Sequence, residues 1–76
     1  MPYVPKPKPC FLDNFAKYRV IHGRQVYKGE DYYYTWDEFH GEIEVFDKCG
    51  LHWGILNATT GEIIKEAVRG RRLDVR

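Results

Sequence analysis

Turn-forming segments recur at short intervals along most of the chain, and their spacing limits the fold more than any other sequence feature. Each contains a glycine, and they span residues 22–23, 28–31, 47–50 and 57–61. The runs between them favour strands and span residues 18–21, 24–27, 32–36, 40–46, 51–56 and 62–68. Aromatic and β-branched residues suit a pleated surface, and tight turns join consecutive strands as antiparallel neighbours. The sequence therefore predicts an antiparallel meander.

The first residues have a different composition. All four prolines fall within residues 1–9, which favours an extended arm or linker with no fold of its own. Residues 10–76 then make one small domain, because a chain of 76 residues buries only a modest core. Phe11 to Tyr18 are expected to form a short helix with Asp13 as its N-cap. The predicted class is therefore α+β, with most of the structure in the sheet.

Several functional classes lack their sequence requirements. No apolar run is long enough to span a membrane, and no signal peptide is visible at the start. The chain has no serine to act as a nucleophile and no glycine-rich phosphate loop. Its two cysteines, Cys10 and Cys49, form no CxxC pair, so we expect free thiols and no zinc site.

Residues 36–44 contain one histidine and four acids. If residues 40–46 form a strand, alternate side chains share a face. The apolar face suits a core and carries Gly41, Ile43 and Val45. The titratable face suits a site and carries His40, Glu42, Glu44 and Phe46. Asp37 would lie in the preceding turn and fold back onto the imidazole.

A helical interpretation of the same stretch has to be weighed. Asp37, His40 and Glu44 also fit the i, i+3, i+7 spacing of a helix face. Gly41 and the β-branched residues at positions 43 and 45 favour the strand.

Charge is segregated along the chain, although the formal net charge is only +1. Residues 30–47 hold seven acids and no lysine or arginine. The basic tail includes Lys65, Arg69, Arg71 and Arg72. We therefore expect acid–base groups beside anion-binding groups, although an ordinary soluble domain can have the same mixed charge.

These groups fit general acid–base cleavage of an RNA phosphodiester better than other chemistries. RNA supplies its own nucleophile, the 2′-hydroxyl, so an enzyme needs a base, an acid for the leaving 5′-oxygen and a cation for the phosphate. Glu44 and His40 are candidates for base and acid, and the basic tail for the cation. Candidates for stacking on unpaired bases are Tyr32, Tyr34, Trp36, Phe46 and Trp53.

Three other interpretations of these residues stay open. His22, His40 and His52 could hold a metal together with nearby acids. Cys49 and His52 could pair as thiol and base. The acidic strand and arginine-rich tail could also be solvated surface, because charged clusters often serve structural networks.

The chain also resembles a known family. The residues that carry the resemblance are Tyr34, Trp36, Asp37, His40, Gly41, Glu42 and Glu44, then Gly50, His52 and Gly54, then Thr60 and Gly61. Through them, residues 32–72 are similar to the cytotoxic domain of ribosome-inactivating colicins and cloacin, and to related C-terminal domains of contact-dependent inhibition toxins. The resemblance implies a small, strongly twisted antiparallel sheet with a short N-terminal helix. It also implies an endoribonuclease that needs no metal or other cofactor, cuts small-subunit (16S) ribosomal RNA in the decoding site and blocks translation.

The resemblance implies roles for individual residues. Asp37, His40, Glu44 and Arg71 occupy the positions of the family's catalytic residues. Glu44 would be the base on the 2′-hydroxyl and His40 the acid, with Asp37 orienting His40 and stabilising its charge.

Further residues are expected to help bind the substrate. They are Glu42, Lys65, Arg69, Arg72, Trp36 and Phe46. Glu42 and Lys65 match charged positions of the family. Phe46 stands where the family has a tyrosine, so the contribution of that hydroxyl is absent.

The resemblance implies partners as well: the ribosome with its small-subunit RNA, and a cognate, usually acidic immunity protein. It implies delivery as part of a larger secreted or surface protein and action in the cytoplasm of a target bacterium, with no membrane insertion by this domain. Two alternative functions are a non-catalytic RNA- or protein-binding β-module and an mRNA-cleaving toxin of a toxin–antitoxin pair. Mapping of RNA ends, and charge-neutral variants at Glu44, would distinguish the three.

Overall fold

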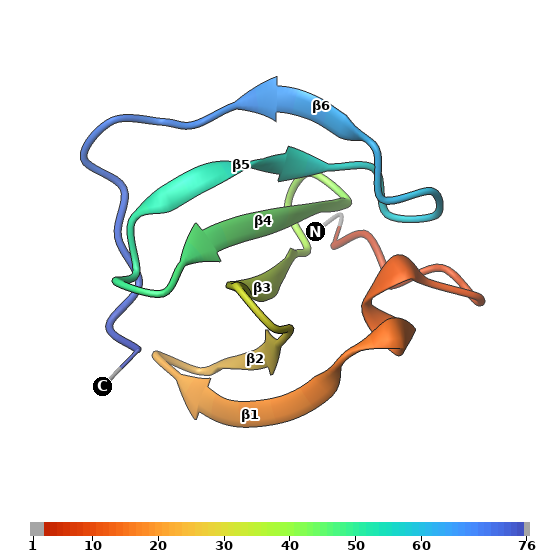
Figure 1. The fold of residues 1–76 in the computed structure, drawn as a ribbon. Coiled ribbons are helices and arrows are strands. Elements are labelled where there is room, and N and C mark those ends of the chain that lie inside the picture. The colour runs from red at the N-terminus through yellow and green to blue at the C-terminus, as the bar shows by residue number, and fades with distance from the viewer. Residues whose placement is uncertain (1–2, 76) are drawn as a thin grey trace.

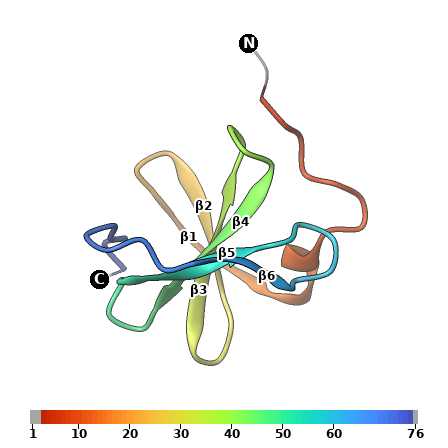
Figure 2. The same cartoon turned by 90° about the horizontal axis from the view of Figure 1, so that it is seen from above.

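Within residues 3–75, which the computed structural model describes, six antiparallel strands form one sheet in the order of the sequence (Figure 1). The strands are β1 (Ala16–Ile21), β2 (Arg24–Lys28), β3 (Tyr32–Asp37), β4 (Glu42–Asp47), β5 (His52–Leu56) and β6 (Ile63–Glu66). Figure 2 shows them fanning out about a common centre, so the sheet is strongly twisted. The predicted antiparallel meander is confirmed.

The α+β class is wrong in its helical part. The only helical element among the described residues is η1 (Phe11–Asn14), a four-residue 3-10 turn. Asp13 lies inside this turn rather than before it, and its carboxylate accepts the N–H of Cys10 at 3.0 Å. Eight residues seldom hold an α-helix alone, and β1 takes the last three of them into the sheet from Ala16 onward.

The strand predicted over residues 40–46 is wrong at its start. β4 begins at Glu42, and His40 and Gly41 belong to the turn that follows β3. Gly41 has a φ of 67°, a conformation that residues with a Cβ rarely adopt, and its N–H donates to the carbonyl of Asp37 at 2.8 Å. His40 therefore approaches the site from a turn, not from the face of a strand.

The two faces of the sheet carry different side chains, as predicted for β4. Opposite residues of β3 and β4 share a face, and Thr35 pairs with Glu44 while Asp37 pairs with Glu42. Ile43 and Val45 lie on the other face, where they are fully buried in the core. The other buried residues of the cluster that contains them are Cys10, Leu12, Tyr27, Tyr34 and Leu56. The face with Glu44 is the one that carries the site.

A bulge between Val45 and Phe46 changes how β4 pairs with β5. Val45 is opposite Gly54, but Phe46 is opposite His52, so Trp53 is the extra residue. The ring of Trp53 contacts Tyr32, whereas the ring of His52 contacts Phe46. The bulge therefore directs His52 to the face that carries Glu44.

The described part of the proline-rich arm, residues 3–9, has no helix or strand but is held to the sheet. The N–H of Val4 donates to the carbonyl of Glu38 at 2.7 Å, and the indole N–H of Trp36 donates to the carbonyl of Val4 at 3.1 Å. The ring of Tyr3 lies 5.3 Å from that of Phe39. The arm thus covers the turn that contains His40.

The segment after β6 returns across the β4–β5 turn (Figure 1). The N–H of His52 donates to the carbonyl of Arg71 at 3.1 Å, and the N–H of Leu73 donates to the carbonyl of Gly50 at 2.7 Å. Gly50 allows this approach, because a Cβ there would lie 2.0 Å from the Leu73 carbonyl oxygen. These backbone contacts place Arg71 beside the start of β5, from where its side chain reaches Glu44 of β4.

Cys10 is buried, Cys49 is exposed, and both are free thiols. Across residues 3–75, no helix has the length and apolar character needed to cross a membrane.

Candidate active site

A cavity of about 370 Å³ opens on the face of the sheet that carries Glu44. All four predicted catalytic residues line it: Asp37, His40, Glu44 and Arg71. They come from the end of β3, the following turn, the middle of β4 and the C-terminal segment. The other lining residues are Ile21, His22, Arg24, Thr35, Phe39, Phe46, Arg72 and Leu73. The structure therefore brings together groups up to 34 positions apart in the sequence (37 to 71).

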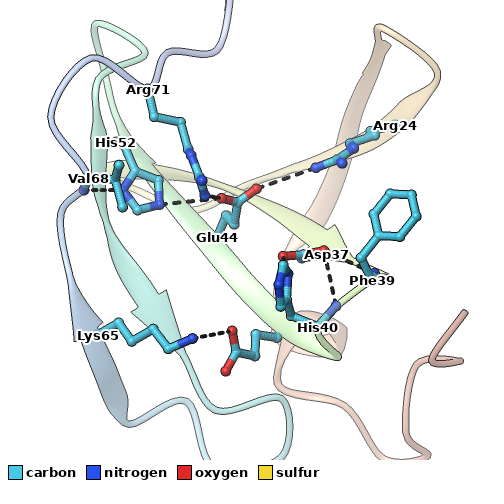
Figure 3. A network of polar contacts seen from close by, with 10 residues as sticks. Arg24, Asp37, Phe39, His40, Glu44, His52, Lys65, Val68 and Arg71 are labelled. Atoms are coloured by element: carbon cyan, nitrogen blue, oxygen red, sulfur yellow. Dashed lines mark hydrogen bonds and ion pairs between the residues drawn. The ribbon is translucent and has the colours of Figure 1, made fainter. Parts of the chain in front are cut away.

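Asp37 and His40 form a closed unit at one end of the cavity (Figure 3). Oδ2 of Asp37 lies 2.8 Å from Nδ1 of His40, and Oδ1 accepts the backbone N–H groups of Phe39 and His40 at 3.0 and 3.3 Å. Because a carboxylate only accepts, Nδ1 carries the hydrogen, and Nε2 is left for a substrate. The His40 side chain is 67% exposed, whereas the Asp37 side chain is almost fully buried.

The charge state of Asp37 follows from opposing influences on its pKa. Burial raises the pKa of this carboxyl, but the hydrogen bond from His40 and those from the two backbone N–H groups lower it further than burial raises it. The pKa of Asp37 therefore lies below its ordinary value, and the group is an anion at neutral pH. An anion in this place holds the imidazole of His40 in one orientation.

Glu44 lies at the centre of the site and is only 5% exposed. Its Oε2 is 3.4 Å from NH1 of Arg24, and its Oε1 contacts NH1 of Arg71 (Figure 3). Both guanidinium groups remain partly exposed, so they can reach a ligand in the cavity. A buried carboxylate needs such partners, because an unpaired charge is costly away from water.

His52 of β5 is a third neighbour of Glu44 and lies on the same face of the sheet. Its side chain is fully buried, and Nδ1 accepts the backbone N–H of Val68 at 2.8 Å. The neutral imidazole must therefore carry its hydrogen on Nε2, which lies 3.5 Å from Oε1 of Glu44 without a hydrogen bond.

The pKa of His52 is consistent with this neutral form. Burial lowers the pKa of the imidazole; Glu44 opposes this effect, and Arg71 adds to it. The pKa of His52 therefore lies below 6.5, its ordinary value. His52 is a neutral support for Glu44 rather than an acid.

Thr35 is a further polar residue at the base of the cavity. It is directly opposite Glu44 on β3 and only 1% exposed. Its hydroxyl has no hydrogen-bond partner among the described residues. A buried hydroxyl without a partner is uncommon, and this one lies directly beside Glu44 in the wall of the cavity.

Not all predicted substrate-binding residues lie at the cavity. Arg72 and Phe46 line it, but Phe46 is 3% exposed and presents no free ring face. Trp36 points to the opposite face, where it packs against the core. Glu42, Lys65 and Arg69 do not line the cavity, and Nζ of Lys65 lies 3.4 Å from Oε1 of Glu42 in a separate ion pair (Figure 3).

Sequence reasoning missed four residues of the site: Arg24, Thr35, Phe39 and His52. His52 belonged to the spacing pattern, but it was considered only as a metal ligand or as the base of a thiol pair and not as a neighbour of Glu44. Arg24 and Thr35 reach the face of the site through strand register, because positions 24 and 26 share a face of β2 and Val26 pairs with Thr35; a single sequence does not specify that register. Phe39 gave no signal, since an aromatic next to a turn is common.

No cluster of three or more histidine, cysteine or acidic side chains that could hold a metal ion occurs within residues 3–75. His22 lies in the β1–β2 turn, His40 pairs with Asp37, and His52 is held by Val68. The thiol of Cys49 is exposed and does not line the cavity.

Comparison with known families identifies the chain. The family model described as Cytotoxic matches residues 16–74, which include all six strands and the C-terminal segment with Arg71. A search of curated proteins and a search of solved structures each return no match. The chain belongs to the Cytotoxic family and is a toxin domain.

Proposed function

We propose that this toxin domain is an endoribonuclease that cleaves RNA through attack of the 2′-hydroxyl on the adjacent phosphate. The observation that carries the proposal is the convergence of Glu44, the Asp37–His40 pair and Arg71 in one cavity. A base, an acid and a cation are the three groups that this reaction needs.

The proposed base is Glu44. Arg71 contacts one of its oxygens in the free protein, and Arg24 lies near the other. When a phosphate enters, its oxygens compete for both guanidinium groups, which frees lone pairs on the carboxylate. Glu44 then takes the proton of the 2′-hydroxyl, whose oxygen bonds to phosphorus.

The proposed acid is His40. Its Nε2 donates a proton to the 5′-oxygen as the bond from phosphorus to that oxygen breaks, and Asp37 stabilises the charged imidazole before this transfer. The products are a 2′,3′-cyclic phosphate and a 5′-hydroxyl. Arg24 and Arg71 offset the charge that develops on the phosphate oxygens.

The substrate and setting rest on the resemblance and the family membership. Small-subunit ribosomal RNA in the decoding site is the proposed target, with no metal required. The same reasoning supports an acidic immunity protein as partner, delivery within a larger protein, and action in the cytoplasm of a target bacterium.

The test adds the purified domain to bacterial ribosomes and maps new RNA ends. We expect one decoding-site cut with a cyclic-phosphate terminus. Glu44→Gln and His40→Ala should each lower its rate by about 10²–10⁴-fold. Glu42→Gln is the matched control, because Glu42 lies on the same strand but outside the cavity.

Each result has a separate meaning. If both variants cut at the wild-type rate, the roles of Glu44 and His40 are wrong. If no RNA is cut but RNA is bound, the domain is a non-catalytic binding module. Cuts at codons of mRNA would instead indicate an mRNA-cleaving toxin.

A further inference from the structure

The aromatic ring that is open to the cavity is Phe39, which the sequence did not single out. Its residue is 53% exposed and lines the cavity with His40, Glu44 and Arg71. Phe46 is buried in the cavity wall, and Trp36 lies on the other face of the sheet. Figure 3 shows the Phe39 ring on the same side of the sheet as Arg24 and Glu44.

The position of Phe39 is fixed by the acid end of the site. Its N–H donates to Oδ1 of Asp37, whose other oxygen lies against the imidazole of His40. The backbone of Phe39 is therefore held next to the Asp37–His40 pair, and its ring extends from this fixed point. A rigid support next to reacting groups is what a substrate-positioning residue requires.

The arm adds a second exposed ring. Tyr3 is 54% exposed, and its ring centroid lies 5.3 Å from that of Phe39 at an interplanar angle of 59°. Val4 is tied to the turn through Glu38 and to β3 through Trp36. If the pair served only to anchor the arm, burial of both rings would be expected, yet each keeps about half its surface in water.

We propose that Phe39, supported by Tyr3, stacks on an unpaired base of the nucleotide next to the phosphate held by Arg24 and Arg71. The inference rests on the proposed ribonuclease function and names its base-binding subsite. Aromatic side chains bind unpaired bases with little sequence preference, because every base has a π-face. The two guanidinium groups in the same cavity supply the matching contact for the phosphate.

The binding test uses a decamer of single-stranded deoxyadenylate, which lacks the 2′-hydroxyl and cannot be cut. Phe39→Leu keeps an apolar contact with Tyr3 but removes the aromatic face. We expect it to weaken decamer binding about tenfold, as loss of one stacked base does, while Phe39→Trp stays within about twofold. Binding of a decamer of abasic deoxyribose phosphate should not change in Phe39→Leu.

Two further variants sharpen the comparison. Tyr3→Leu should weaken decamer binding by a smaller factor than Phe39→Leu, since Tyr3 only supports the ring. Trp53→Leu is the control: Trp53 is an exposed aromatic whose ring packs with Tyr32 on the other face. Thermal midpoints show whether every variant folds.

The outcomes separate this inference from the proposed function. Unchanged decamer binding in Phe39→Leu overturns the inference, whether or not ribosomes are cut. Equal loss of binding to the normal and abasic decamers also overturns it, because Phe39 would then act only through the turn. If the wild type stacks on the decamer but never cuts RNA, the ribonuclease proposal fails and the base-binding site remains.

Discussion

Removing the hydroxyl of Thr35 is expected to affect stability and cleavage differently. It is buried opposite Glu44 and has no partner among the described residues. Thr35→Val replaces it with a methyl group of similar size, so we expect the free energy of unfolding to stay constant or rise by about 1 kcal/mol. Cleavage of ribosomes should fall about tenfold if the hydroxyl donates to the substrate.

Urea denaturation and initial cleavage rates measure the two effects. A loss of stability of about 2 kcal/mol would show that the hydroxyl is bonded in the folded protein. Unchanged cleavage would show that the substrate makes no bond to it.

His52 gives the fold a dependence on pH with a defined sign. Its pKa is lower in the folded protein than the ordinary 6.5, because it is buried beside Arg71 with only Glu44 opposing. Below pH 6.5 the unfolded chain therefore holds the extra proton, and the free energy of unfolding falls as the pH falls. The slope from this one group is at most about 1.4 kcal/mol per pH unit.

Urea midpoints between pH 7.5 and the acid range test this assignment. His52→Gln should remove most of the slope that begins near pH 6.5, since glutamine can still accept the Val68 N–H but does not titrate. His22→Gln, in the exposed β1–β2 turn, should leave the slope in place. The assignment is wrong if the two variants behave alike.

At the scale of elements, turn chemistry predicted the meander because each turn contains a glycine and each strand is β-prone. The helix predicted over residues 11–18 is absent because residues from Ala16 to Ile21 pair with β2 instead. Local capping signals carry no information about such a distant partner. His40 was misplaced for a related reason. Alternation along residues 40–46 looked continuous, but Gly41 reverses the chain by adopting a positive φ.

Without the family resemblance, which singled out Arg71 from the basic tail, the site was predictable in detail only where its residues are close in sequence. Asp37 and His40 are three positions apart, and their pairing follows from a single turn. Arg24 reaches Glu44 because β2, β3 and β4 are neighbours in register, and His52 reaches it because a bulge shifts β5. Register and bulges depend on packing across strands, which a single sequence does not specify.

The C-terminal segment is an element whose placement determines whether Arg71 reaches the site. Gly50 and Gly70 both have a φ of 87°, so alanine at either position carries a similar backbone strain of about 1–2 kcal/mol. Only at Gly50 would the new Cβ meet the Leu73 carbonyl oxygen; at Gly70 nothing lies within 4 Å. Gly50→Ala should therefore displace residues 71–73.

We expect Gly50→Ala to reduce ribosome cleavage by more than tenfold, because the side chain of Arg71 no longer reaches the site. Gly70→Ala should reduce cleavage only to the extent that its lower stability reduces the fraction of folded protein. Cleavage rates measured well below each thermal midpoint make the comparison. Equal loss in both variants would mean that backbone strain, and not the docking of the segment, controls activity.

Considered as a whole, the molecule pairs most of its site cations with its own acids. Arg24 and Arg71 contact Glu44 in the cavity, and outside it Lys65 contacts Glu42. These paired cations therefore add little net positive charge where they lie, and the formal net charge of the whole chain is only +1. Under the proposed function, long-range attraction to RNA is weak, and binding depends on a few cations that exchange an acid for a phosphate. Such an exchange would let a nearly neutral chain hold a polyanion at one point.

This charge arrangement predicts how cleavage depends on salt. If Arg24, Arg71 and Arg72 each neutralise one phosphate, log(kcat/KM) should fall with log[KCl] with a slope of about −2, since each contact on a single strand contributes about −0.7. Arg24→Gln should make the slope shallower by about 0.7. Lys17→Gln removes the same charge from β1, outside the cavity, and should leave the slope unchanged. Because both variants lower the net charge equally, equal changes in slope would show that overall charge governs binding, and the cavity would lose its role as the phosphate site.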